Sequence, residues 1–502
     1  MDNPFMSAIS ATFSLLVTVI HAIPGSAIAI DYIKNSYQND PSASSLSWPW
    51  PYTPSSICCP KSTVLTPTTS SLLKRYPSSS IHQEIDELIA EWQPEPLVQP
   101  LSDIQRMELD RTQVIIGAQG PKPKVLATGK NLMNLASTNY LGYITNEDIK
   151  QKANETLHNY GVGSCGPPGF YGTLDVHINL EKDIAKFLGT EAAIIYAQGF
   201  STIASVISAF SKRRDIIVAD NGCNFAVLKG TQISRSTVKW FKHNDMADLE
   251  HHKKRPLTRR FIVTEGLFQN YGDMAPLDKI MEFKHRYKYR VILDESSSFG
   301  LLGKTGRGLT ELYNIPPRDV DMIVGSMANT LSGAGGFCAV VDHQRLSGQA
   351  FVFSASIPAM LAVCASEAIR ILETSQGEKL LKTLQDNAAV FRAVVASVPQ
   401  AIELSSMSGS PILHLRIPSH VVAAAGISTR DGETLLLQEI VDEVAVKDAL
   451  LITRAKYVET QELHLPRPSI RISVSASHTK KDTEKAAQAI KSAFVNALNK
   501  RK

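Results

Sequence analysis

Residues 291–300 read Val-Ile-Leu-Asp-Glu-Ser-Ser-Ser-Phe-Gly, a short apolar run that ends in an acidic, serine-rich turn. Similar apolar runs occupy residues 192–196, 216–219, 261–264, 322–324 and 337–341, and helical or loop stretches separate them. Short apolar runs bounded by turn residues are typical of buried strands. Because strands that alternate with helices favour a mostly parallel sheet, these residues predict an α/β body.

The C-terminal part of the chain has a different pattern. Helical periodicity covers residues 359–373 and 378–397, and short apolar runs follow at 412–415 and 470–474. We therefore predict a large domain over residues 131–343 and a smaller α+β domain over residues 344–502. No internal repeat recurs at a fixed period, which argues against a repeat architecture.

Residues 1–36 predict an attachment to a membrane. Residues 5–30 are apolar and uncharged, and as a helix they are long enough to cross a bilayer of roughly 30 Å. Pro24-Gly25 would break such a helix, and residues 27–29 (Ala-Ile-Ala) resemble a signal-peptidase site. Basic residues follow the segment from Lys34 onward and would hold that side in the cytosol. We expect an anchor or interfacial helix, with a cleaved signal as the alternative.

The next segments connect this region to the large domain. Residues 37–80 are rich in Ser, Thr and Pro, so we expect an irregular tether there. Residues 81–130 form an N-terminal arm. Its first helix is expected to open at Ser80, with a capping box to Gln83, and to end at Pro94.

The composition excludes several classes of function. The 502 residues carry a formal net charge of only +4 and no long basic run, so we expect no nucleic-acid partner. The cysteines form no CxxC pair, which argues against a metal site or a disulfide framework and fits a reducing compartment. They are Cys58, Cys59, Cys165, Cys223, Cys338 and Cys364. We interpret the adjacent Cys58 and Cys59 as packing residues or acylation sites.

Four glycine-rich or polar clusters lie where strands are predicted to end, which is where ligands bind in open α/β folds. They are residues 161–173, 198–201, 293–300 and 325–337. Glycines permit a close backbone approach, and the free amides of a helix opening at 198–201 can receive a phosphate. Each signal alone is weak, because an acid such as Asp294 more often caps a turn. In this order, however, they match the parts of a pyridoxal-phosphate site.

With these clusters, the chain resembles the α-oxoamine synthases, a branch of the fold-type I pyridoxal-phosphate enzymes. Within that branch it is similar to the first long-chain-base subunits of serine palmitoyltransferase. The likeness runs from Glu84 to the C-terminus and includes residues 91–97, 160–176, 241–246, 341–347 and 353–356. The resemblance implies a large domain with a mostly parallel sheet and a smaller C-terminal domain.

The resemblance also implies a degenerate cofactor site. In the catalytic members, the cofactor-binding lysine falls on Asn329, and an amide has no nucleophilic amine. Their cofactor-stacking histidine falls on Asn224, and the histidine that follows the aspartate falls on Ser297. The aspartate itself remains, as Asp294. We therefore expect no catalytic residue in this chain.

Relatives of this fold are dimers with active sites at the interface. The resemblance implies a heterodimer with a catalytic second long-chain-base subunit, which binds pyridoxal phosphate covalently. That complex condenses L-serine with palmitoyl-CoA to 3-ketosphinganine, the first step of sphingolipid synthesis, on the cytosolic face of the endoplasmic reticulum membrane. Small membrane regulatory subunits are further candidate partners. The residues expected to complete the partner's pocket are Cys165, Gly166, Phe170, Tyr171, Gly333, Gly335 and Gly336.

Two alternatives remain at this stage. In one, the chain is an active homodimeric synthase that uses another lysine. Lys304 lies in a glycine-rich turn, and we interpret it as a solvated loop charge. In the other, the chain is a regulatory scaffold that touches no active site.

The remaining residues of interest are one arginine, three histidines and one proline. Arg471 falls where catalytic relatives bind a substrate carboxylate, but a structural salt bridge is the favoured role here. We interpret His177, His243 and His478 as structural histidines. Pro168 stands where this family usually has an arginine, so contacts made by that side chain are in doubt.

Overall fold

The computed structural model describes residues 78–93, 96–98, 100–252, 258–339 and 342–501. The chain divides into two units, Met1–Gln99 and Pro100–Lys502. The predicted membrane segment, nearly all of the predicted tether, and Cys58 and Cys59 lie outside the described residues. Among the described helices, none is both long and apolar enough to span a membrane.

The described part of the first unit contains helix α4 (Ser78–Glu91). Ser80 lies inside this helix, so the predicted capping box at Ser80 is wrong. Three consecutive serines offer equivalent caps, and the sequence pattern does not distinguish them. The helix exposes large apolar side chains, at Ile85, Leu88 and Ile89.

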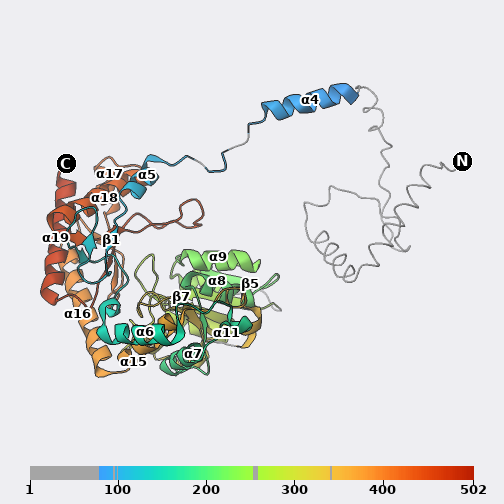
Figure 1. Cartoon of the computed structure of the whole chain (residues 1–502). Helices are drawn as coiled ribbons and strands as arrows, with labels where there is room; N and C mark the ends of the chain where they lie inside the picture. The colour runs from blue at the N-terminus through green and yellow to red at the C-terminus, as the bar shows by residue number, and fades with distance from the viewer. Residues whose placement is uncertain (1–77, 94–95, 99, 253–257, 340–341, 502) are drawn as a thin grey trace, which may run out of the picture. The chain divides into compact units, whose positions relative to one another are not determined.

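A seven-stranded sheet forms the centre of the second unit (Figure 1). Its order is β4-β10-β9-β8-β7-β5-β6, and all neighbours are parallel except β10, which is antiparallel to β4 and β9. The strands are β4 (Ile194–Tyr196), β5 (Ile216–Asp220), β6 (Thr237–Phe241), β7 (Arg260–Glu265), β8 (Arg290–Asp294), β9 (Met322–Ser326) and β10 (Gly336–Cys338). The predicted mostly parallel sheet is confirmed. Only β6 was missed, because this edge strand alternates exposed and half-buried residues.

Helices cover both faces of this sheet. Figure 1 shows α8 and α9 above the strands and α7 and α11 below them. The helices of this region are α6 (Glu147–Tyr160), α7 (Asp175–Leu188), α8 (Gly199–Phe210), α9 (Phe225–Ser234), α10 (Met246–His251), α11 (Leu277–Tyr287), α12 (Leu309–Leu312), α13 (Asp342–Ser347), α14 (Gln349–Val352) and α15 (Ala359–Leu372). Apart from the edge strand β6, the strands between these helix layers are mostly buried. Their side chains form a large part of the hydrophobic core.

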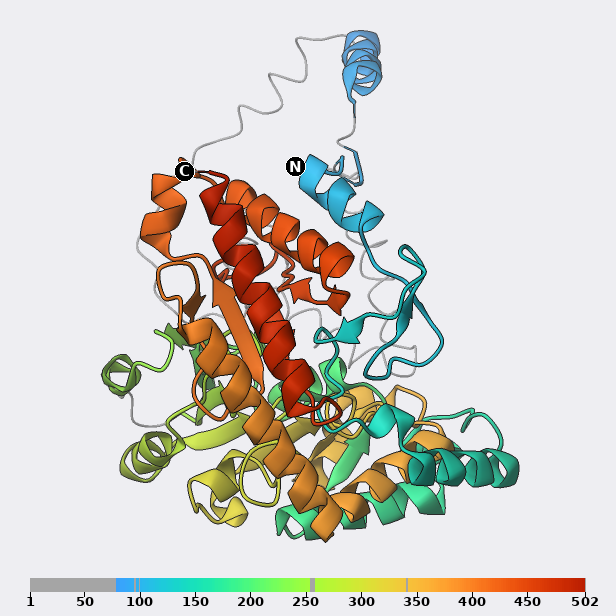
Figure 2. The ribbon, with the colours of Figure 1, turned by 90° about the vertical axis from the view of Figure 1, so that its left-hand side faces the viewer.

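The C-terminal part forms a second, antiparallel sheet in the order β11-β12-β15-β14. Its strands are β11 (Glu403–Leu404), β12 (Ile412–Arg416), β14 (Thr453–Arg454) and β15 (Ile470–Ser473). Long helices run side by side next to this sheet (Figure 2). They are α16 (Ser375–Ala396), α18 (Arg430–Lys447) and α19 (Lys480–Asn499), and the short α17 (Ser419–Ala424) precedes α18. The predicted α+β character of this region is confirmed.

The packing does not follow the predicted domain limits. Helices α13, α14 and α15 belong in sequence to the smaller domain, yet they pack on α6, α7 and α8. Conversely, β3 (Met133–Asn134) pairs with β13 (Leu450–Leu451), and Glu108 of α5 (Asp103–Asp110) forms an ion pair with Arg454. A hairpin of β1 (Ile115–Ile116) and β2 (Lys124–Val125) lies between α5 and β3. Segments that precede the large sheet in sequence therefore pack with the C-terminal region, and segments that follow it pack with the large domain.

Candidate functional site

The parallel strands β7 and β8 place two acids side by side at one edge of the large sheet. Glu265 ends β7 and Asp294 ends β8, and the two residues are partners in the register. Both are about 2% exposed, because layers of apolar residues cover the strands on both faces. Asn224 joins them. Its backbone N–H donates to Glu265 Oε1 at 2.5 Å, and its side-chain amide donates to Asp294 Oδ2 at 3.1 Å.

Asn224 is also the N-cap of helix α9. Its Oδ1 accepts hydrogen bonds from the backbone N–H groups of Ala226 and Val227, at 2.9 and 3.2 Å. The side chain is therefore held at both ends, by α9 and by Asp294. The other oxygen of Asp294 accepts from the Ser296 N–H at 2.9 Å. Each oxygen of Asp294 thus accepts a hydrogen bond from a group of this chain.

Burial changes the protonation of these acids. Burial, followed by the charge of the neighbouring Asp294, raises the pKa of Glu265 to about 8. Burial also raises the pKa of Asp294. A third buried acid, Glu295, has its pKa raised by burial to about 7, although it accepts hydrogen bonds from Ser298 and from the Leu309 N–H. Near neutral pH the carboxyl group of Glu265 is therefore largely protonated.

Asn329 lies in the turn after β9 and reaches the same place. Its side-chain amide donates to the Ser296 carbonyl oxygen at 2.8 Å. Ser297, which follows Ser296 in the chain, is buried. The structure thus brings together all four residues of the predicted degenerate site, Asn224, Asp294, Ser297 and Asn329. The helix expected to receive a phosphate, α8, begins at Gly199, where an added Cβ would lie 2.9 Å from Ser326 Oγ of β9.

These residues do not fit a covalently bound pyridoxal phosphate. An amide at position 329 cannot form an imine with an aldehyde. The carboxylate that would face a pyridinium nitrogen is Asp294, and Asn224 and Ser296 already use both of its oxygens. Asn224 and Asn329 therefore supply hydrogen bonds at this site, but neither supplies an amine that could hold the cofactor covalently.

The glycine-rich segment 161–173 forms a rigid loop at the surface. The Ser356 N–H donates to the Gly166 carbonyl at 2.9 Å, and Ser164 Oγ donates to the Ser356 carbonyl at 3.0 Å. Cys165 and Tyr171 have positive φ values of 54° and 64°. An added Cβ at Gly172 would collide with the Gly166 carbonyl, so this close approach is internal to the loop.

The loop exposes an aromatic patch, which we define as Val162, Phe170, Tyr171 and Phe353. Tyr171 is fully exposed, and Phe170 is 59% exposed. Val162 and Phe353 are also exposed, and Phe353 lies three residues before Ser356, which holds the loop. Cys165 is a free, exposed thiol beside these residues in sequence. Clustered exposed apolar side chains of this kind mark interaction surfaces.

Gly335 and Gly336, which are predicted to complete a partner's pocket, make close contacts within this chain. Both are buried, because β10 inserts between β4 and β9. An added Cβ at Gly335 would collide with the Tyr196 carbonyl, and one at Gly336 would collide with Thr202. The close approach that these glycines permit is therefore within the chain. Gly333 differs, because the nearest atom to its added Cβ would be 3.6 Å away, at an ordinary contact distance.

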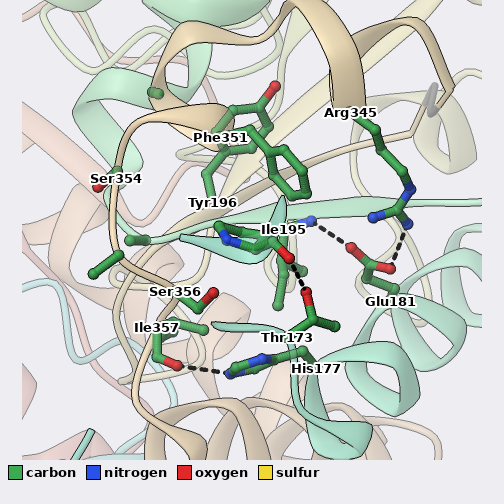
Figure 3. Close-up of a pocket in the computed structure, with 14 residues that line it drawn as sticks. Thr173, His177, Glu181, Ile195, Tyr196, Arg345, Phe351, Ser354, Ser356 and Ile357 are labelled. Carbon is green, nitrogen blue, oxygen red and sulfur yellow. Dashed lines mark hydrogen bonds and ion pairs between the residues drawn. The ribbon is translucent and has the colours of Figure 1, made fainter. Parts of the chain in front are cut away.

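A small cavity of about 20 Å³ lies behind the glycine-rich loop (Figure 3). Pro168, His177, Tyr196 and Phe351 are among its lining residues. A space of this size holds about one water molecule, so it cannot take a substrate. Pro168 thus lines a cavity wall, where it makes no charged contact.

His177 is structural, as predicted. The Leu174 N–H donates to its Nδ1 at 3.0 Å, so Nε2 carries the proton and donates to the Ile357 carbonyl at 2.7 Å. Burial lowers its pKa, and the ring is neutral. His478 is also structural, with Nε2 2.9 Å from the Asn134 carbonyl oxygen.

His243 is structural too, but it is charged. Its ring nitrogens lie 2.8 Å from Asp220 Oδ1 and 2.9 Å from Asp273 Oδ2, and it stacks on Tyr271 at 4.2 Å between ring centroids. Burial lowers its pKa, but the hydrogen bonds to the two aspartates outweigh burial and raise the pKa to about 9. Asp220 also accepts from the Gly222 N–H at 2.7 Å, so this cluster holds the loop that leads to Asn224.

Other predicted residues stand apart from this network. Lys304 is exposed, as expected of a solvated loop charge. Arg471 forms no ion pair with any described residue, so the described chain does not supply the favoured structural salt bridge. The Nε of Arg471 has no hydrogen-bond partner among these residues either. No disulfide joins the described cysteines, and the described residues contain no cluster that could hold a metal ion.

Comparisons with known proteins agree with this architecture. The family described as aminotransferase class I and II matches residues 130–490. The long chain base biosynthesis protein 1b of Oryza sativa is 44% identical, over 83% of this chain and 86% of its own length. Serine palmitoyltransferase 1 of Dictyostelium discoideum is 42% identical over 81% of this chain and 86% of its own length. Serine palmitoyltransferase 1 of Saccharomyces cerevisiae is 33% identical over 96% of this chain and 94% of its own length.

Solved structures give the same fold. The serine palmitoyltransferase of Sphingomonas wittichii superposes on this chain with a TM-score of 0.67. The superposition covers 83% of this chain and 97% of the Sphingomonas chain. At 22% identity this likeness shows the fold, which is that of the fold-type I pyridoxal-phosphate enzymes.

Proposed function

This chain belongs to the family of serine palmitoyltransferases 1 and long-chain-base proteins 1, and from that premise we propose that it is the non-catalytic subunit of a serine palmitoyltransferase. The complex condenses L-serine with palmitoyl-CoA to 3-ketosphinganine and releases CO2 and CoA. A second long-chain-base subunit supplies the lysine that holds pyridoxal phosphate.

The observation that carries this proposal is the hydrogen-bond network around Asp294. Asn329 occupies the exit of β9 and is bonded to the Ser296 carbonyl, while Asn224 is bonded to Asp294. None of these side chains supplies an amine, so a covalent bond to the cofactor requires a second chain. Lys304, the candidate for an active homodimer, is exposed in a loop.

The aromatic patch is the surface that this chain offers to its partner. Phe170 and Tyr171 protrude from a loop that hydrogen bonds hold against residues 354–357, so their positions are fixed before binding. Preorganised aromatic side chains are typical anchors of protein interfaces. On this proposal Cys165, Gly166 and Gly333 complete the partner's pocket.

The proposed complex lies on the cytosolic face of the endoplasmic reticulum membrane. The apolar segment 5–30 supports this location, because it is long enough to enter a bilayer. Small membrane subunits that regulate the complex would then bind near the same end of the chain.

The test uses the chain alone and the chain co-purified with the lysine-bearing subunit. In each sample we would record the visible absorbance of covalently bound pyridoxal phosphate and the serine-dependent release of CoA. Both signals should appear only in the mixture. Absorbance and turnover from this chain alone would establish the active homodimer instead.

A pair of variants then separates the subunit role from that of a remote scaffold. Tyr171→Ala removes a fully exposed ring, so it should leave the fold intact and reduce turnover in the mixture at least several-fold. Lys304→Ala, also at an exposed position, is the matched control and should leave turnover unchanged. Full turnover with Tyr171→Ala at equal co-purification would favour the scaffold.

A further inference from the structure

Arg416 is a buried cation that forms no ion pair with any described residue. It ends strand β12 and is only 8% exposed. Within the described part of the chain, its Nε and Nη2 have no hydrogen-bond acceptor, and it forms no ion pair. Because an unpaired charge is strongly unfavourable in a protein interior, this position calls for an anion.

Further donors lie around this guanidinium. Arg416 lies over the ring of Tyr271, at 5.6 Å from its centroid. The Tyr457 hydroxyl is buried and has no hydrogen-bond partner among the described residues. Burial raises the pKa of Tyr457 to about 12, while the charge of Arg416 opposes that rise, so the hydroxyl is protonated and lies within the field of Arg416.

Arg471 adds a second positive charge on the same face of the sheet. His414 of β12 is opposite Arg471 of β15 in the register, so Arg416, two residues further along, lies diagonally from Arg471. The Nε of Arg471 also has no hydrogen-bond partner in the described chain. The opposite face, with Leu413, Leu415 and their neighbours, is buried and apolar.

The groups around the two arginines do not neutralise them. His414 donates from Nε2 to the Gln269 carbonyl, and its other nitrogen lies 2.9 Å from Ser469 Oγ. Burial, together with the charges of both guanidiniums, lowers the pKa of His414 to about 3, so His414 is neutral. Glu403, opposite Arg416 in the register, is paired with Arg467, as is Glu433.

We propose that Arg416, together with Tyr457 and Arg471, binds a phosphoryl group on the polar face of the smaller sheet. A guanidinium fork presents parallel N–H groups that match two phosphate oxygens, and the hydroxyl of Tyr457 supplies a further donor. A phosphoryl group carries nearly two negative charges at neutral pH, which balances the two arginines. The site depends on neither a cofactor nor the proposed partner.

The first experiment measures thermal unfolding of the full chain in phosphate and in chloride at equal ionic strength. Phosphate should raise the midpoint of the wild-type chain, and Arg416→Gln should weaken the apparent affinity at least tenfold. The matched control is Arg318→Gln at an exposed arginine, which should respond like wild type. In phosphate-free buffer, Arg416→Gln should be at least as stable as wild type, because it removes an unpaired buried charge. Equal phosphate responses in wild type and Arg416→Gln would overturn the proposal.

A second variant covers the case in which Arg416→Gln does not fold. Tyr457→Phe keeps the ring beneath Arg430, at 5.8 Å, and removes only the hydroxyl. Calorimetric titration with inorganic phosphate should show several-fold weaker binding to Tyr457→Phe than to wild type. Titration with glycerol 3-phosphate distinguishes the source of the group: tighter binding than phosphate would identify a phosphate monoester, and weaker binding the free ion. Binding of neither above the level of chloride would overturn the assignment.

Discussion

Replacement of Glu265 by glutamine should abolish much of the dependence of stability on pH. Glu265 has its pKa raised to about 8 in the folded chain, first by burial and then by Asp294, against an ordinary value of 4.5. A carboxyl group with a raised pKa stabilises the fold fully below pH 4.5, and this contribution is lost as the pH rises through 8. The wild-type chain should therefore become less stable between pH 6 and pH 9.

The size of this loss follows from the two pKa values. At pH 6 the protonated carboxyl contributes roughly 3 kcal/mol relative to its fully ionised form, and at pH 9 it contributes about zero. The amide of the Glu265→Gln variant would be neutral at every pH, like the protonated acid. It would keep the acceptor for the Asn224 N–H but lose the one for the Gln269 N–H, now 3.1 Å from Oε2. Glu265→Gln should thus cost about 1–2 kcal/mol at pH 6 and be more stable than wild type at pH 9.

The assay is urea unfolding of both chains at pH 6, 7, 8 and 9. The quantity of interest is the difference between the two unfolding free energies, because the titration of all other groups largely cancels in that difference. Glu378→Gln changes an exposed carboxylate and serves as the control, with a profile that should follow wild type. Parallel wild-type and Glu265→Gln profiles would mean that Glu265 is already ionised at pH 6, and the reasoning would be refuted.

Three further predictions concern neighbouring features. His243→Asn should destabilise the chain by roughly 3 kcal/mol at pH 6 but much less at pH 9.5, as measured by urea unfolding at both pH values. The raised pKa of His243 gives a contribution to stability that is full below pH 6.5 and is lost as the pH rises through about 9. Gly172→Ala should lower the midpoint of thermal unfolding markedly, because the added Cβ would collide with the Gly166 carbonyl. Gly169→Ala has open space around its Cβ and should be tolerated, so equal midpoints for the two variants would contradict the loop geometry. Asn329→Lys should give no visible absorbance of bound pyridoxal phosphate in the chain alone, because Asn224 still holds Asp294; a strong band would show that the lysine alone restores the site.

The sequence predicted the large sheet because its strands are buried on both faces and therefore read as continuous apolar runs. Six of the seven strands were recognised in this way. Strand β6 has only one buried neighbour strand and exposes Thr237 and Lys239, so it carries no such run. Contacts across the predicted domain limit could not be anticipated, because chain order does not reveal that α15 packs on α6 or that β3 pairs with β13.

The site was predicted in part. Parallel strands end at one edge, so the clusters at 293–300 and 325–337 could be expected to meet, and Asn329 does reach Ser296. Glu265 was missed because an acid before a glycine reads as a turn residue, and only the register of β7 and β8 reveals its neighbour. The pairing of His243 with Asp220 and Asp273 brings together residues from three segments, and no local pattern encodes it.

The His243 and Glu265–Asp294 clusters together hold the loop that carries Asn224. Asp220, held by His243, fixes the Gly222 N–H, while Glu265 and Asp294 fix the backbone and the side chain of Asn224 two residues later. The loop 221–224 is thereby held from both sides by this chain's own groups. If Asp294 were replaced by an apolar residue, the Asn224 amide and the Ser296 N–H would lose their acceptors, at a cost of about 1–3 kcal/mol for each buried donor. A carboxylate at this position therefore has a structural role that does not depend on any bound cofactor.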